Sequence, residues 1–267
     1  MKNRLSVKLK HIYGIEHIAH SPLRAAFGRF DGMQKKHAAA IERLIIKAHS
    51  EALPSALISF AGTEGTAVYT TEEEKEKLLQ TSGLDFLISL EDGNTEENRT
   101  LVKRRLQLAS FTDLSAFDNT EELDSCFEAR DFLSFLQLCG RPYSMIGTVM
   151  HGKGRGKTVG MPTINLSIPP NKKRPPEGVY ATITHIDGKT YKGVTNIGRR
   201  PSVDTDDTVT IETFLFDFRR DIYGQKISLD VYTLIRNVMK FDGLEAVKAQ
   251  VQKDIISARN FFSDSGL

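Results

Sequence analysis

The stretch Gly178-Val-Tyr-Ala-Thr-Ile-Thr-His-Ile-Asp-Gly-Lys-Thr-Tyr-Lys-Gly-Val-Thr-Asn196 decides the fold of the C-terminal half. Its two arms are rich in β-branched and aromatic residues, which favour strands. Asp187-Gly188 between them is a strong signal for a tight hairpin turn. Strands are therefore predicted over 178–185 and 189–196, and similar runs predict three more over 146–150, 209–218 and 226–235. Several short strands separated by turns indicate a small antiparallel β-barrel.

A helix is expected to follow the barrel at the end of the chain. It is predicted to start at Asp242, with Glu245 completing a capping box. Its apolar stripe is interpreted as the surface that packs on the barrel, and consists of Leu244, Val247, Val251 and Ile255.

The N-terminal half has a different pattern, in which helical periods alternate with short apolar runs. Apolar residues at helical spacing predict a helix over 35–49, and a second helix over 72–81 is capped by Thr70 or Thr71 and ended by Gly83. Strands are predicted over 56–60 and 85–90. This alternation indicates a parallel sheet covered by helices, an α/β fold. The boundary is expected near Leu138–Arg141, which gives domains 1–139 and 140–267.

The composition is typical of a globular protein with two domains. The chain has 267 residues, of which 40% are hydrophobic and 26% charged, and a formal net charge of +2. That charge gives no global attraction to nucleic acid or to a membrane surface. No apolar run approaches the ~20 residues that span a bilayer, and no apolar signal core follows the N-terminus. Cys126 and Cys139 make neither a disulfide framework nor a metal-binding spacing, so a reducing cytoplasm is expected.

The run His151-Gly-Lys-Gly-Arg-Gly-Lys-Thr-Val-Gly-Met-Pro-Thr-Ile-Asn165 combines glycines with cations. Glycine lets backbone N–H groups approach an anion closely, and the interleaved cations supply matching charge. Thr163 and Asn165 are two residues apart on an extended stretch, so they share a face and could share a metal ion. The run therefore outlines a phosphate-and-magnesium site. The alternative, which this run alone leaves open, is a flexible basic loop beside a turn with local side-chain bonds.

Further segments follow this run in a specific order. They are Pro176-Glu-Gly-Val-Tyr-Ala181, Asn196-Ile-Gly-Arg-Arg-Pro201, Ile211-Glu-Thr-Phe-Leu-Phe-Asp-Phe218, Asp221-Ile-Tyr-Gly224, and Ile235-Arg236 before Lys240-Phe241. As a set, from about Arg141 to Phe262, they resemble the riboflavin kinase module, the C-terminal half of bacterial bifunctional riboflavin kinase/FAD synthetases. The resemblance implies transfer of the ATP γ-phosphoryl group to the ribityl 5′-hydroxyl of riboflavin, which gives FMN and ADP.

The resemblance also implies where ATP and Mg²⁺ bind. Thr163 and Asn165 would hold the metal through neutral oxygens, which suit Mg²⁺ when phosphates supply the negative charge. The family motif is Pro-Thr-Ala-Asn; here Ile164 replaces the alanine, and its side chain is expected to point away from the metal. The residues expected to contact ATP are Gly152, Lys153, Gly154, Arg155, Gly156, Lys157, Thr163 and Asn196.

Glu212 matches the family's catalytic base. Strand alternation places Glu212, Phe214 and Phe216 on one face and Ile211, Thr213 and Leu215 on the other. A carboxylate that shares a face with two phenylalanines is a poor fit for a plain solvent face, although a solvated strand face is the alternative.

Four residues are expected on the flavin side: Gly198, Arg200, Arg236 and Phe241. An ordinary loop and a surface arginine are the alternative for these positions. The isoalloxazine ring would need an apolar cleft, with the start of the last helix and the loop before it as its wall.

The segment Phe27-Gly-Arg-Phe-Asp-Gly-Met-Gln-Lys-Lys-His37 resembles the opening of the family's FMN adenylyltransferase half, where the pattern is Gly-x-Phe-Asp-Gly-x-His-x-Gly-His. Asp31 and His37 match, but Gln34 replaces a histidine and Lys36 replaces a glycine. Glutamine cannot carry the charge of an imidazolium. The second family motif, aligned with Asp124–Arg130, is mostly lost, and the stretch between Leu90 and Asp124 is too short for the family's flavin-binding insertion.

Residues 1–139 are therefore interpreted as a Rossmann-like nucleotidyltransferase fold that has lost its chemistry and serves as support, as a protein-binding surface or in regulation. The hypothesis for the whole chain is a cytoplasmic riboflavin kinase that acts on small molecules, without nucleic-acid or membrane partners. Two alternatives remain: a still-bifunctional riboflavin kinase/FAD synthetase, and a flavin-sensing or nucleic-acid-binding regulator.

Overall fold

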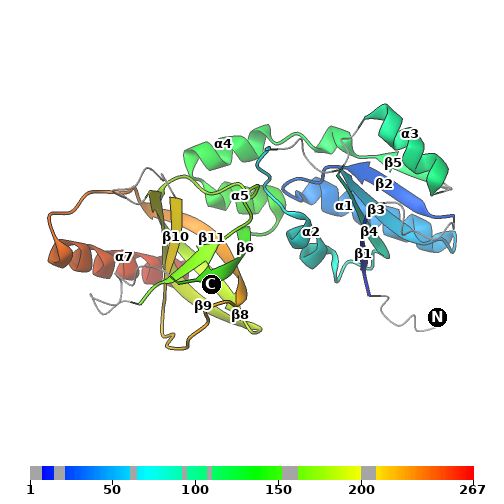
Figure 1. The fold of residues 1–267 in the computed structure, drawn as a ribbon. Coiled ribbons are helices and arrows are strands. Elements are labelled where there is room, and N and C mark those ends of the chain that lie inside the picture. Colours follow the sequence, from blue (N-terminus) through cyan, green and yellow to red (C-terminus); the bar gives the residue numbers. More distant parts are fainter. Residues whose placement is uncertain are drawn as a thin grey trace. The chain divides into compact units, whose positions relative to one another are not determined.

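The computed structural model describes residues 8–14, 22–60, 65–91, 95–106, 110–151, 162–199 and 209–267. The chain forms two compact units (Figure 1). The N-terminal unit comprises Met1–Glu122 and Asn171–Lys173, and the C-terminal unit comprises Leu123–Pro170 and Arg174–Leu267. No helix among the described residues combines the length and the apolar character needed to cross a bilayer.

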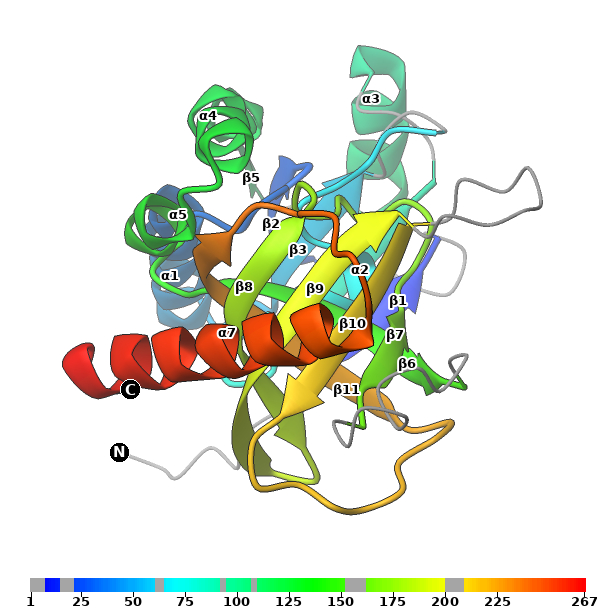
Figure 2. The same cartoon turned by 90° about the vertical axis from the view of Figure 1, so that its left-hand side faces the viewer.

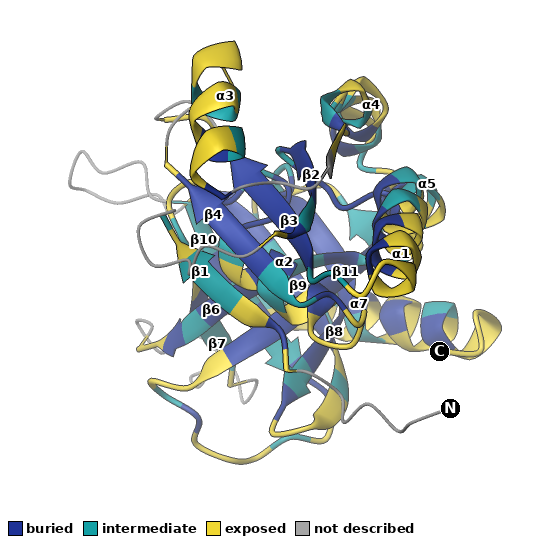
Figure 3. Ribbon diagram, turned by 90° about the vertical axis from the view of Figure 1, so that its right-hand side faces the viewer, coloured by how far each residue is buried: buried dark blue, intermediate teal, exposed yellow. Residues whose placement is uncertain are grey.

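The N-terminal unit is built on a parallel sheet with the strand order β1-β4-β3-β2-β5. The strands are β1 Lys10–Tyr13, β2 Arg24–Gly28, β3 Ser55–Phe60, β4 Phe86–Leu90 and β5 Ser110–Asp113. Helices α1 Lys35–Ser50 and α2 Glu72–Leu79 contribute to the core on one face, and α3 Glu96–Arg105 to the core on the other. The central strands are accordingly buried (Figure 3). The predicted α/β fold is confirmed.

The local signals in this unit act as expected. The spacing in α1 buries Ile41, Leu44, Ile45 and Ala48 against the sheet. Thr71 caps α2, because its hydroxyl accepts from Glu74 N and the Glu74 carboxylate accepts from Thr71 N. Gly83, with φ +84°, permits the turn into β4.

The C-terminal unit contains a closed barrel with the strand order β10-β7-β6-β11-β8-β9. The strands are β6 Tyr143–Met150, β7 Ile164–Ser167, β8 Gly178–Ile186, β9 Lys189–Arg199, β10 Val209–Leu215 and β11 Lys226–Arg236. All pairings are antiparallel. Asp187 (φ 50°) and Gly188 (φ 74°) form the predicted tight turn, since both adopt the left-handed conformation it requires. The predicted barrel is confirmed, with β7 as an additional strand.

Helix α7, Leu244–Asp264, crosses the outer surface of the barrel over β8 and β9 (Figure 2). Ala258 and Phe262 of α7 pack into a cluster with Val179, Ala181, Ile183, Val194, Phe216 and Tyr232. The predicted capping box is wrong: Gly243 occupies the N-cap position and no side chain caps the helix. The interpretation of the apolar stripe is correct for Ile255 only, because Leu244, Val247 and Val251 line a cavity beside the barrel.

The C-terminal unit also includes the helix α5, Phe132–Cys139, and most of α4, Glu121–Ala129, which follows the short 3-10 turn η1, Ser115–Phe117. Phe127, Phe132 and Phe135 all contact the ring of Tyr143 in β6, with centroid distances of 4.7, 5.9 and 5.3 Å. These aromatic contacts are why the compact unit begins at Leu123, earlier than the family boundary predicted at 139/140. That family boundary stays a prediction.

Candidate functional site

Three polar residues form a row across the outer surface of the barrel. Glu212 of β10 lies opposite Asn165 of β7 on one side and opposite Asn196 of β9 on the other. Residues directly opposite each other on neighbouring strands present their side chains on the same face of the sheet. The register therefore brings together a carboxylate and two amides from three segments of the chain.

The alternation along β10 is as predicted. Ile211, Thr213 and Leu215 are buried, whereas Glu212 and Phe214 are only partly buried. The inner face is buried beside Glu212: the Thr195 hydroxyl lies 2.8 Å from the hydroxyls of both Thr182 and Thr213, and all three residues are buried. A ligand of this barrel must therefore bind on its outer face, where Glu212 lies.

A cavity of about 410 Å³ lies on this outer face, between the barrel and helix α7. Its walls come from β8, β9, β10, the end of β11 and the first turns of α7. The polar lining residues are Thr163, Asn196, Glu212, Arg236 and Asp254, and the apolar ones are Val179, Val194, Phe214, Val238, Met239, Phe241, Leu244, Val247 and Val251. An apolar pocket with a few convergent polar groups is the usual form of a small-molecule site.

The cavity unites most of the described residues that were predicted for the flavin side and for catalysis. Glu212, Arg236 and Phe241 all line it, as do Thr163 and Asn196. Gly198 is buried next to Val238 and Asn196, which both line the cavity, and a Cβ there would lie in ordinary van der Waals contact with both. Thr210 Oγ1 lies 3.5 Å from Glu212 Oε1 and 3.4 Å from the Gly198 carbonyl oxygen.

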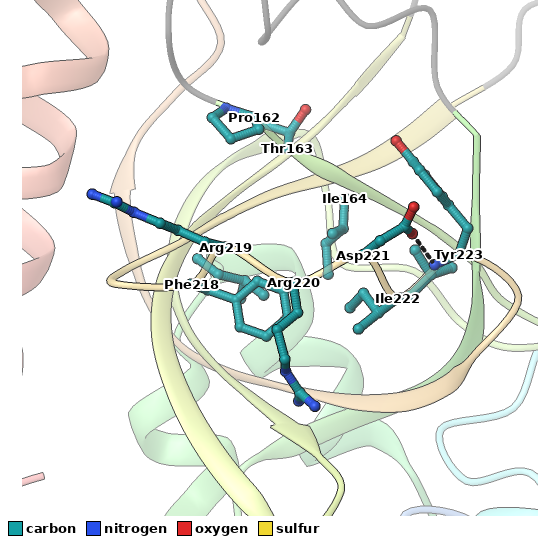
Figure 4. Close-up of a pocket in the computed structure, with 11 residues that line it drawn as sticks. Pro162, Thr163, Ile164, Phe218, Arg219, Arg220, Asp221, Ile222 and Tyr223 are labelled. Carbon is teal, nitrogen blue, oxygen red and sulfur yellow. Dashed lines mark hydrogen bonds between the residues drawn. The ribbon is translucent and has the colours of Figure 1, made fainter.

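A second cavity, of about 230 Å³, lies next to the first and shares Thr163 with it. Figure 4 shows Pro162, Thr163 and Ile164 on one side of it and the segment 218–223 around the rest. That segment contributes Arg219, Arg220, Asp221 and Tyr223, and Asp221 Oδ1 accepts from Tyr223 N at 3.0 Å. The sequence analysis gave Arg219 and Arg220 no role, although a pair of adjacent arginines is one signal for an anionic ligand.

The residues present fit Mg²⁺ in combination with phosphate. Among the described residues no group of three or more His, Cys, Asp or Glu side chains could hold a metal. A cation here would depend on neutral oxygens of Thr163 and Asn165 together with phosphate oxygens, as Mg²⁺ binding through its substrate often does. Ile164 pairs with the inward-facing Thr213, so it points away from the face of Asn165 as expected.

Some predicted positions lie outside the described residues. These are Gly152, Lys153, Gly154, Arg155, Gly156, Lys157 and Arg200. Their proposed contacts with ATP and flavin stay predictions.

In the N-terminal unit the chain itself supplies hydrogen-bond partners for Asp31 and Gln34 of the adenylyltransferase-like motif, whereas the buried His37 Nε2 makes no hydrogen bond within the described residues. Asp31 is buried and accepts from Gly32 N and Thr70 N at 3.0 and 2.9 Å. Burial raises the pKa of the Asp31 carboxyl, and the charge of Lys75 opposes that rise. Gln34 is buried too, and its Nε2 donates to the Asn119 carbonyl oxygen at 3.2 Å. Lys36 is half-buried.

A carboxylate that the sequence analysis missed lies beside this motif. Asp118 accepts from Arg29 N at 2.7 Å and from Phe30 N at 2.8 Å. Nε2 of the fully buried His37 lies 3.6 Å from Asp118 Oδ1. Nothing in the sequence around Asp118 signals this contact, because its partners are 88 and 89 residues away in the chain.

The sequence of the C-terminal half is similar to that of known proteins. The riboflavin kinase family model matches residues 139–262. A bifunctional riboflavin kinase/FMN adenylyltransferase from Listeria monocytogenes is 39% identical over 127 residues, which cover 48% of this chain and 40% of the relative. An RNA-binding riboflavin kinase, RibR, from Bacillus subtilis is 39% identical over 121 residues, covering 45% of this chain and 52% of that protein. The chain thus spans about half or less of these relatives' length.

Two matches extend over both units. The bifunctional riboflavin kinase/FMN adenylyltransferase of Escherichia coli is 27% identical over 309 aligned positions, covering 95% of this chain and 98% of the relative. A solved structure from Streptococcus pneumoniae, described as a macrolide-efflux protein, has the same fold with a TM-score of 0.77 at 21% identity, and covers 95% of this chain and 99% of that chain. Residues 139–262, which contain the barrel and the site, therefore match the riboflavin kinase family model.

Proposed function

We propose that the protein is a riboflavin kinase, which transfers the γ-phosphoryl group of ATP to the ribityl 5′-hydroxyl of riboflavin and releases FMN and ADP. The observation that carries the proposal is the 410 Å³ cavity, where Glu212, Thr163 and Asn196 meet an apolar wall. That apolar wall suits the isoalloxazine ring, and the polar side chains of Glu212 and Asn196 suit the hydroxyl groups of the ribityl chain. The proposed substrates are small molecules and the proposed compartment is the cytoplasm.

The two neighbouring cavities support an arrangement in which the two substrates bind on opposite sides of Thr163. Riboflavin would occupy the larger cavity, and the nucleotide would extend toward the smaller one, where Arg219 supplies positive charge. The neighbouring Arg220 donates to Asp187 Oδ2 at 3.2 Å. Thr163 lines both cavities, so it lies where the phosphoryl group would pass. Mg²⁺ held by Thr163 and Asn165 would neutralise charge on the phosphates during transfer.

Glu212 would orient the ribityl hydroxyl and accept its proton. Because the phosphoryl group passes through a loose transition state, orientation of the hydroxyl contributes more than its early deprotonation. Riboflavin bound in the cavity would shield the partly buried Glu212 from water, which would compete as nucleophile.

The test is chromatographic analysis of the products formed from riboflavin, ATP and Mg²⁺. FMN as a product is the expected result. If neither FMN nor FAD forms, the kinase proposal fails and the alternative of a flavin-sensing or nucleic-acid-binding regulator gains support. That alternative has one specific point in its favour, the relative whose name records RNA binding.

We also propose that residues 1–139, up to the predicted family boundary, have lost FMN adenylyl transfer. In an open parallel sheet, ligands bind at the carboxyl ends of the strands where the strand order reverses. Here that point lies between β2 and β5. The backbone N–H groups after β2, at Arg29 and Phe30, already donate to the Asp118 carboxylate that follows β5. An ATP phosphate would have to displace this internal anion.

The competing candidate is a bifunctional enzyme, favoured by the likeness to the Escherichia coli protein over both units. Incubation with FMN, fresh ATP and Mg²⁺ at high enzyme concentration separates the two. Unchanged FMN is expected, whereas FAD would show that Gln34, Lys36 and Asp118 are compatible with adenylyl transfer. Binding of a protein partner is the proposed remaining role of this unit.

A further inference from the structure

Asp254 of α7 is a buried carboxylate that lines the larger cavity, and neither the sequence motifs nor the proposed reaction uses it. It holds Arg236 at the end of β11 in a two-pronged ion pair. Arg236 Nε donates to both carboxylate oxygens at 2.9 and 3.1 Å, and Nη2 donates to Oδ2 at 2.9 Å. The Asp254 side chain is 3% exposed and the Arg236 side chain 18%.

The remaining contacts fix the plane of the guanidinium group. Arg236 Nη1 donates to the Asn237 carbonyl oxygen at 3.0 Å, and Gln250 Nε2 donates to Asp254 Oδ1 at 2.9 Å. The guanidinium carbon lies 5.6 Å from the ring centre of Phe241. Asp254 therefore joins β11, the loop after it and α7, which are the elements that wall this end of the cavity.

A β-bulge brings Arg236 into this position. On β11, Leu234 pairs with Tyr180 and Arg236 pairs with Val179, so Ile235 is an extra residue. A bulge changes the direction in which the following side chain points. Val179 in turn lies opposite Asn196, which lies opposite Glu212. Arg236 thus lies three strand spacings from Glu212, or about 14 Å along the curved wall of the barrel at about 4.8 Å per strand.

We propose that Asp254 is a positioning residue for the flavin ring, acting through Arg236. This inference rests on the proposed riboflavin kinase function. The separation from Glu212 suits a ligand whose ribityl chain reaches Glu212 and whose ring system lies at the Arg236 end. The isoalloxazine ring of riboflavin is uncharged and planar. The ion pair provides a planar, charge-balanced wall held in place before the ligand arrives, which lowers the ordering cost of binding.

The test compares Asp254→Asn with Asp264→Asn, which removes the same charge from an exposed position on the same helix. Riboflavin affinity is measured without turnover by quenching of flavin fluorescence, and KM and kcat are then measured for both substrates. For Asp254→Asn, the Kd and KM for riboflavin should rise about tenfold or more, because removal of one partner leaves the other charge unpaired. The KM for ATP and the value of kcat should change less than about threefold, since Asp254 contacts neither Glu212 nor Thr163 in the reaction proposed.

If Asp254→Asn destabilises the fold, a double-mutant cycle still tests the proposal, because it compares the effect of Asp254→Asn with and without Arg236. In an Arg236→Gln background, Asp254→Asn should add little further loss of riboflavin affinity, because both act through one pair. Asp254→Glu, which keeps the charge, should recover part of the affinity. Equal losses in both backgrounds, or a parallel rise in the KM for ATP, would overturn the proposal and leave Asp254 a merely structural residue. A wild-type protein that forms no FMN would instead refute the proposed function.

Discussion

The two units each gather polar groups at one place, after β2 in the N-terminal unit and on the outer face of the barrel in the C-terminal unit, but the partners of these groups differ. After β2 of the N-terminal unit, the backbone N–H groups of Arg29 and Phe30 are occupied by Asp118, and Gln34 is bound to Asn119. In the C-terminal unit, Glu212 and Asn196 face a cavity of about 410 Å³. A polar cluster that the chain itself satisfies adds stability. One that opens onto a cavity of ligand size can act on a substrate.

The strongest test of this contrast is Glu212→Gln. Removal of the proton acceptor should lower kcat for FMN formation about 10²–10⁴-fold while riboflavin and ATP still bind, because glutamine keeps the size of the side chain. Single-turnover FMN formation measures the effect. Turnover close to that of the wild type would mean that Glu212 is not the base and that the open cavity is not a catalytic site.

Asn165→Ala should have the next largest effect. Loss of one neutral ligand should weaken Mg²⁺-dependent ATP binding about tenfold, in line with the loss of one strong hydrogen bond or metal contact. Calorimetric titration with ATP, with and without Mg²⁺, measures it. An ATP affinity that stays unchanged in Mg²⁺ would remove Asn165 from the metal site.

Asp118→Ala tests the N-terminal unit, where the Asp118 carboxylate occupies the backbone N–H groups of Arg29 and Phe30. Two backbone N–H groups would lose a charged acceptor, each worth about 1.5–3 kcal/mol, so the free energy of unfolding of the N-terminal unit should fall. Urea unfolding followed by circular dichroism measures the change, and Asp264→Asn serves as a control. The rate of FMN formation should stay unchanged. A loss of kinase activity without unfolding would contradict the proposal that the C-terminal unit alone carries this activity.

The smallest effect concerns stability at alkaline pH. Burial raises the pKa of Tyr180 to about 12, and its hydroxyl donates to the Pro176 carbonyl oxygen at 2.6 Å. The folded state thus favours the protonated phenol. This contribution is complete below the unfolded pKa of about 10 and is lost as pH rises from there to the folded value. Tyr180→Phe should flatten this alkaline loss of thermal stability, and an unaltered loss would assign it to another group.

Much of the fold was predictable because its signals are local. The hairpin at Asp187-Gly188, the cap at Thr71 and the buried face of α1 depend only on residues a few positions apart. The capping box at Asp242 failed for a local reason too, since Gly243 takes the cap position. The division of the chain at Leu123 was not predictable, because it follows from the packing of Phe127, Phe132 and Phe135 on Tyr143.

By itself the sequence determined that the C-terminal half forms a strand-rich barrel and that Glu212 shares a face with Phe214, because alternation along one strand is set by the strand's own geometry. It also predicts that Thr163 and Asn165 form a pair on one face. Only the tertiary structure decided that Asp254 holds Arg236 and that Asp118 occupies the N–H groups of Arg29 and Phe30. Such pairings depend on strand register, on the bulge in β11 and on helix placement, which are settled by the packing of residues far apart in the chain.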